Sequence, residues 1–234
     1  MKSKLWFILA IVVFGFVPCY VQATIMTFND QAMFLTATGA TSATGPLPNL
    51  GIIPGGAAAS QTVGTVTFSI ASPSTSLVIG VAGQVGIVNN DWTTRLPGFD
   101  LAISDVENLN AAFASPGLSA GFDFAEPQND PNVNGPFVDS TFTVTLKNGG
   151  VTVDAFTFNA PNDMAAFVGV WSDTLFNLVE IRETVGGVGN EFFGQFYSGA
   201  RPLQAAPIPE PATIVLMLAG VGVLAGMRWR QSQG

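Results

Sequence analysis

The sequence predicts an all-β protein, because short segments rich in β-branched and aromatic residues recur at intervals of roughly ten residues. Glycine, proline and asparagine, which favour turns, stand between these segments. The expected strands are residues 62–70, 118–124, 140–146, 151–158, 166–171, 176–182 and 191–197. Strands at this spacing are typical of an antiparallel β-sandwich, and a jelly roll is the topology that we expect. A β-barrel or a β-helix is the alternative, although no fixed repeat period accompanies it.

The clearest hairpin is expected around residues 147–150 (KNGG). Val144 and Leu146 alternate with polar residues before this turn, and Val151 and Val153 do so after it. A period of two places these apolar side chains on one face of a sheet. The Asn-Gly pair between the two runs favours a tight turn.

Only residues 29–38 (NDQAMFLTAT) show a helical pattern. Asn29 or Asp30 is the expected N-cap, and Met33 and Phe34 recur near helical spacing. The chain also holds nineteen phenylalanines, most of which we expect in the core of the sandwich.

The composition excludes several classes of function. Between the two apolar ends, four basic residues face fifteen acidic ones, a net charge of about −11 that would repel a phosphate backbone, so we expect no binding to nucleic acid. The chain has no histidine, and Cys19 is its only cysteine. Zinc sites built from histidine and cysteine are therefore excluded, as is catalysis by a Ser-His-Asp or Cys-His arrangement.

The N-terminal segment predicts a secretory signal peptide. Lys2 and Lys4 precede thirteen apolar residues, 5–17, and residues 21–23 (VQA) form a small-residue exit. We expect signal peptidase to cleave after Ala23. A permanent membrane anchor is the alternative, but thirteen residues are too few to span about 30 Å of hydrocarbon.

The C-terminal segment predicts a membrane helix over residues 212–227, a run of sixteen residues without a charge. Arg228 and Arg230 follow it and are expected to stay in the cytoplasm, as is the basic N-terminus. Because proline is tolerated only in the first turn of a helix, residues 209–211 should be extended and accessible at the outer face of the membrane.

The tripeptide Pro209, Glu210 and Pro211, the apolar run and the terminal arginines together resemble the PEP-CTERM protein-sorting signal. The resemblance covers about the last 25 residues. It implies that an exosortase, a membrane cysteine protease of bacteria that mostly make exopolysaccharide, recognises the tripeptide and removes the tail. It assigns Arg228 and Arg230 as retention charges, although the basic cluster is only R-W-R. An ordinary tail anchor is the alternative.

Parts of the body resemble the globular region of other exported PEP-CTERM proteins. These parts are residues 27–39, 121–124, 167–183 and 190–199. The resemblance supports the β-sandwich and carries no activity with it.

A calcium site is one interpretation of residues 130–135 (DPNVNG), which match the first half of a calcium loop in which alternate oxygens converge on one ion. The candidate metal ligands are Asp130, Asn132, Asn134 and Asp139, with Glu126 as an additional carboxylate. A threonine stands where a bidentate glutamate would close such a loop, and a strand follows instead of a helix. A surface turn is the alternative.

A second acidic group consists of Glu180, Glu183, Asn190 and Glu191. Glu180 shares a strand face with Arg182, so the two are expected to pair. Glu183 and Glu191 are expected to flank a hairpin through residues 186–189. They could hold a structural calcium ion or lie in solvent as hydrated charges.

No catalytic motif is present, so we expect a protein that is not an enzyme. Trp92 and Trp171 are candidates for glycan contact, although a place in the core is the commoner role for tryptophan in such folds.

The sequence thus predicts a signal peptide (1–23), a β-sandwich domain (24–206) and a sorting signal (207–234) with the PEP motif at 209–211, a membrane helix at 212–227 and a basic end at 228–230. We expect an exported, non-catalytic protein of the envelope or extracellular matrix, anchored transiently in the inner membrane. Its expected partners are the secretion machinery, signal peptidase, exosortase and exopolysaccharide. A calcium-dependent carbohydrate-binding module, or a glycosidase that acts on exopolysaccharide, is the alternative.

Overall fold

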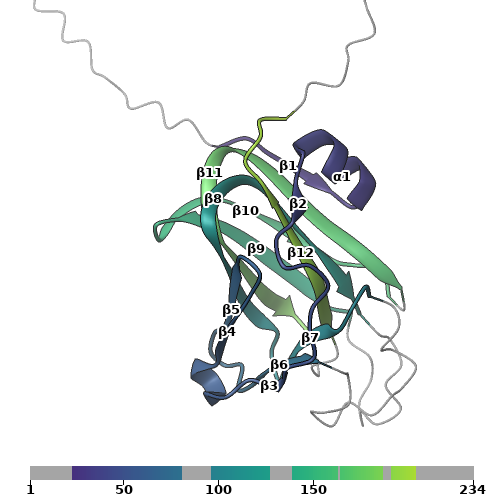
Figure 1. Ribbon diagram of the computed structural model, residues 1–234, viewed down its shortest axis with the longest axis vertical. Helices are drawn as coiled ribbons and strands as arrows, with labels where there is room; N and C mark the ends of the chain where they lie inside the picture. The colour runs from purple at the N-terminus through teal and green to yellow at the C-terminus, as the bar shows by residue number, and fades with distance from the viewer. Residues whose placement is uncertain (1–22, 81–95, 127–138, 163, 187–190, 204–234) are drawn as a thin grey trace, which may run out of the picture.

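The computed structural model describes residues 23–80, 96–126, 139–162, 164–186 and 191–203. These residues form a single antiparallel sheet with one short helix, so the prediction of an all-β fold is confirmed (Figure 1). The elements are β1 (Ile25–Phe28), α1 (Gln31–Thr38), β2 (Thr41–Ser42), β3 (Gly51–Ile52), the 3-10 turn η1 (Gly56–Ala58), β4 (Ser60–Val63), β5 (Val66–Ile70), β6 (Leu77–Gly80), β7 (Asp100–Ile103), β8 (Asn108–Ala125), β9 (Thr141–Asn148), β10 (Val151–Phe158), β11 (Ala165–Val185) and β12 (Phe192–Gly199).

Two long strands, β8 and β11, bend and so belong to both layers of the fold (Figure 1). The first part of β11, residues 165–171, pairs with residues 119–125 of β8, beside β1 and β12. After shifts of register, residues 178–182 of β11 pair with residues 108–112 of β8, beside β5 and β9. The strand order is β10-β9-β11-β8-β12-β7-β6-β3.

The prediction of two separate strands at 166–171 and 176–182 is therefore wrong. Ser172, Asp173 and Thr174 interrupt the apolar pattern, and the backbone N–H of Thr174 donates to the Ser172 hydroxyl at 3.1 Å. This interruption is a bend within one strand. Residues 114–116 of β8 are exposed at the matching position, and the sequence prediction began that strand ten residues too late, at Leu118.

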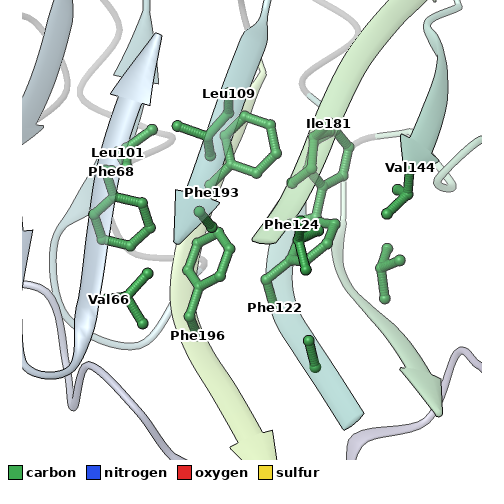
Figure 2. Close-up of a cluster of buried hydrophobic side chains, with 14 of the residues drawn as sticks. Val66, Phe68, Leu101, Leu109, Phe122, Phe124, Val144, Ile181, Phe193 and Phe196 are labelled. Atoms are coloured by element: carbon green, nitrogen blue, oxygen red, sulfur yellow. The ribbon is translucent and has the colours of Figure 1, made fainter. Parts of the chain in front are cut away.

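The core lies between the two layers and holds eight buried phenylalanines among valine, leucine, isoleucine and alanine side chains, in keeping with the many phenylalanines of the sequence (Figure 2). The ring of Phe68 on β5 packs against Phe196 on β12, with ring centroids 4.9 Å apart. Phe124 on β8 packs edge-on against Phe142 on β9 at 5.3 Å. Such pairs contribute about 0.5–1.5 kcal/mol each beyond the burial of their area. They join strands that are not neighbours in the sheet, which makes the arrangement sandwich-like.

The hairpin of β9 and β10 is confirmed, with Gly149 and Gly150 in its turn at positive φ. The predicted strand at 62–70 is instead the hairpin of β4 and β5. Gly64 turns the chain between them with a φ of 59°, a conformation that glycine adopts without a steric cost.

The predicted helix is confirmed as α1. The Asp30 side chain accepts a hydrogen bond from the backbone N–H of Met33 at 2.8 Å, and Gly39 ends the helix at a φ of 63°. Phe34 is fully buried and lies against Phe28 and Phe167, so it seats the helix on the outer face of the sheet.

The jelly-roll topology stays a prediction. The expected signal peptide and membrane helix lie outside the described residues. Within the described part of the chain, no helix has the length and apolar character needed to cross a membrane.

Candidate functional site

Three glutamates from distant parts of the chain converge at one end of the β domain. Glu107 directly precedes β8, Glu183 lies near the end of β11, and Glu191 directly precedes β12. Each offers a carboxylate oxygen, and these oxygens all lie within 4.8 Å of one another. We call Glu107, Glu183 and Glu191 the acidic cluster.

Glu107 is the most enclosed member of the acidic cluster. It is fully buried, and among the described residues neither of its carboxylate oxygens has a hydrogen-bond donor. Burial, and after it the charges of Glu191 and Glu183, raise the pKa of Glu107 to about 12. A carboxyl group in such a place must either be protonated and neutral or lie beside a cation.

Ser140 and Glu126 lie beside the acidic cluster. The Ser140 hydroxyl donates a hydrogen bond to Glu191 Oε1 and lies 3.5 Å from Glu183 Oε1. Its backbone N–H donates to Glu126 Oε1 at 2.6 Å, and the backbone N–H of Glu107 donates to Glu183 Oε2 at 3.0 Å. Burial raises the pKa of Glu126 to about 7, although the Ser140 N–H opposes this shift. These bonds fix where the carboxylates point.

The atoms of the acidic cluster that could coordinate a metal ion are all carboxylate oxygens. Carboxylate oxygens suit hard cations such as Ca²⁺, Mg²⁺ and Mn²⁺, whereas zinc and copper favour nitrogen and sulfur. The alternative state of such a cluster is a set of carboxyl groups that share protons.

A groove of about 510 Å³ lies at a separate place, along β1, the end of β10 and the start of β11. Partly buried aromatic rings and exposed polar side chains line it together, and the lining includes Phe28, Asn29, Phe156, Thr157, Phe158 and Asn159. Apolar rings beside convergent amide and hydroxyl groups are typical of sites for small polar ligands.

Residues 207–231 match the family model described as the PEP-CTERM protein-sorting motif. The chain carries a PEP-CTERM sorting motif. No curated protein and no solved structure matches the chain.

The PEP-CTERM motif confirms the resemblance predicted from Pro209, Glu210 and Pro211, and the matched range reaches Arg228 and Arg230. PEP-CTERM proteins are exported and are anchored in the membrane before exosortase processes them. The match therefore supports export of this chain, with exosortase as its processing partner. The motif itself lies outside the described residues.

The acidic residues that the sequence singled out have different outcomes in the structure. Glu183 and Glu191 do come together, but the hairpin predicted between them is wrong, because β12 pairs with β8 and the end of β11 pairs with β9. Glu180 pairs with Lys147 at 2.8 Å and with Arg182 at 3.7 Å, as expected for the latter.

Three ligands of the predicted calcium loop, Asp130, Asn132 and Asn134, lie outside the described residues, as do Trp92 and Asn190. Asp139 is described and exposed, directly before Ser140, and its charge contributes to the raised pKa of Glu126. Trp171 is partly exposed, and its indole N–H donates to the carbonyl of Arg201 at 3.4 Å.

Sequence reasoning missed Glu107 and Ser140. Glu107 is a single carboxylate before a strand, and no spacing motif links it to Glu183 or Glu191. The available signal was its place at the start of an alternating run, N-L-N-A-A-F, which marks a strand end.

Proposed function

We propose that this chain is an exported, non-catalytic protein of the cell envelope or extracellular matrix that exosortase processes at its PEP-CTERM motif. The observation that carries this proposal is the match of residues 207–231 to the sorting motif. The delivered body is the β domain, for which we also propose a jelly-roll topology.

The route follows from the charges at both ends. The signal peptide, residues 1–23, starts export, and the apolar helix at 212–227 holds the chain in the inner membrane with Arg228 and Arg230 on the cytoplasmic side. Residues 209–211 then lie outside the membrane within reach of exosortase. Cleavage releases the body to the cell surface or to the exopolysaccharide matrix.

The acidic cluster does not have the geometry of a glycosidase site, which supports a role without catalysis. A glycosidase needs two carboxyl groups about 5 to 9.5 Å apart that both reach the substrate. The oxygens of the acidic cluster lie within 4.8 Å of one another, and Glu107 is fully buried.

Substitution of the motif in the native host tests the sorting proposal. Replacing Pro209, Glu210 and Pro211 together by alanine should leave the tail in place, so that the chain accumulates in the inner-membrane fraction. Pro202→Ala is the control, an exposed proline upstream of the motif, and it should be processed as the wild type is. Normal release of the triple variant, or an unchanged location after deletion of the exosortase gene, would contradict the proposal.

A calcium-dependent carbohydrate-binding module is the second candidate, and the aromatic and polar lining of the groove favours it. A glycan array with and without calcium tests this function. Thr157→Ala and Asn159→Ala change exposed groove residues and should weaken any glycan signal, whereas Asp173→Asn, an exposed residue at the bend of β11, should not. No signal on exopolysaccharide fragments would remove this candidate.

A further inference from the structure

We propose that Glu107, Glu183 and Glu191 bind a divalent cation of the calcium class, which joins the ends of three strands. The proposal concerns the β domain itself and does not depend on the sorting motif.

Glu107 and Glu183 bring two carboxylates together with no ion pair to a basic side chain among the described residues. The two ion pairs among the described residues both use Glu180, and neither includes Glu107 or Glu183. The chain contains no histidine that could supply a positive charge in their place. Carboxylates this close repel one another unless a proton or a cation lies between them.

Glu107 is a buried carboxyl group whose oxygens lack hydrogen-bond donors in the described part of the chain. Its side chain is fully buried and points into the acidic cluster, and neither oxygen has a donor among the described residues. A buried polar atom without a partner costs free energy, so natural proteins rarely leave one unless a ligand satisfies it. Glu126 adds a further buried oxygen without a partner next to Ser140.

Hydrogen bonds hold the carboxylates of Glu183 and Glu191 in place before any cation binds. The Ser140 hydroxyl bonds to Glu191 and approaches Glu183, and the backbone N–H of Glu107 holds the other oxygen of Glu183. Outer-shell hydrogen bonds of this kind orient the carboxylates that bind a metal. The cluster is therefore held in the form that binds a cation.

Calcium fits this donor set best. It takes six to eight oxygen ligands in flexible geometry, whereas magnesium demands a near-ideal octahedron and keeps several of its waters. Three carboxylates on separate strand ends suit the flexible coordination of calcium better than the strict octahedron of magnesium. Sites of extracellular modules commonly bind calcium with a Kd of about 10⁻⁴ to 10⁻³ M.

The consequence is a body that gains stability where calcium is available. A cation that binds only the folded chain stabilises it by mass action. It would fix the start of β8, the end of β11 and the start of β12 to one another, and these ends come from both layers of the fold.

Thermal unfolding of the full chain in detergent micelles tests the site, with CaCl₂, with MgCl₂ and with EDTA. We expect calcium to raise the Tm of the wild type and magnesium to raise it less. Glu107→Gln should abolish the calcium shift and lower the calcium affinity measured by titration calorimetry by more than about tenfold, as loss of a ligand should exceed loss of an outer-shell partner.

In EDTA the Glu107→Gln chain should melt at or above the wild-type temperature, because glutamine has a similar shape, carries no charge and can donate to the neighbouring carboxylates. A variant that melts below the wild type in calcium but at or above it in EDTA has lost a metal ligand, whereas a variant with a damaged fold would melt below the wild type in both. If Glu107→Gln does not fold, Glu183→Gln, half-buried on β11, carries the same prediction.

Two controls locate the effect. Glu180→Gln, on the same strand as Glu183 but in the ion pair with Lys147, should keep the calcium shift, and so should Asp130→Asn. The proposal is overturned by the absence of a calcium shift in the wild type, by an undiminished shift in Glu107→Gln, or by a shift that only Asp130→Asn removes.

Discussion

At the scale of single residues, Asp123 on β8 is a buried carboxylate with three polar partners, namely Tyr197, Gln31 and the backbone N–H of Gln195. The Tyr197 hydroxyl donates to Asp123 Oδ2 at 3.3 Å, and Gln31 of α1 donates to Oδ1 at 3.4 Å. Burial raises the pKa of Asp123 from 3.8 to about 6, although both Tyr197 and a backbone bond from Gln195 oppose the shift. Between about pH 4 and pH 6, Asp123 is therefore protonated in the folded chain and ionised in the unfolded chain.

This shift sets a pH dependence of stability. Because the pKa is raised on folding, Asp123 is most favourable for folding below about pH 4, and its contribution is lost as the pH rises to about 6. Asp123→Asn keeps an acceptor for Tyr197 and removes the titration. We expect the free energy of unfolding of Asp123→Asn, minus that of the wild type, to increase by about 2–3 kcal/mol between pH 4 and pH 6.5.

Urea unfolding at several pH values, followed by tryptophan fluorescence, measures this difference. Asp173→Asn is the control, an exposed aspartate at the bend of β11. A difference between Asp123→Asn and the wild type that stays constant with pH would show that Asp123 does not take up a proton on folding.

At the scale of elements, α1 rests on a flat part of the sheet made by Gly121 and Gly169. The two glycines are paired across β8 and β11. A Cβ atom at Gly169 would lie 2.7 Å from the ring of Phe167 and 2.9 Å from that of Phe34, and one at Gly121 would lie 2.6 Å from Phe167. The missing side chains thus leave the space that both rings fill.

Filling this space should loosen the helix. Gly169→Ala forces both rings to move and should lower the free energy of unfolding by about 1–3 kcal/mol, the usual cost of overpacking. Phe34→Ala should cost about 3–5 kcal/mol, because it empties a fully buried position.

Denaturant unfolding measures both costs. Met33→Ala changes an exposed side chain on the same helix and should stay within about 0.5 kcal/mol of the wild type. A Gly169→Ala chain as stable as the wild type would contradict the tight seat of α1.

The sequence predicted individual elements well where a local signal defines them. Asp30 and Gly39 bracket the helix, and the alternation of Val144 and Leu146 identified β9 and its inward face. It failed where one strand serves two layers: the polar break after Trp171 indicated a loop, whereas the strand bends there and continues. A local pattern indicates which residues are buried, but a bend within one strand and a loop between two strands both appear in it as a short polar interruption.

At the scale of the whole molecule, the acidic cluster shows why a site is harder to predict than a strand. Glu107, Glu183 and Glu191 meet only because the start of β8, the end of β11 and the start of β12 lie at the same place, and this depends on long-range pairing. The sorting signal is the opposite case. Its meaning lies in a contiguous run of residues, so the sequence predicted it and the family model confirmed it.

The intact mass of the protein isolated from its native host tests the central claim, export followed by removal of the tail, most directly. The account predicts a chain that begins at Thr24 and lacks both the apolar run at 212–227 and the arginines that follow it. A mass that retains residues 212–234, found on protein in the inner-membrane fraction, would contradict it.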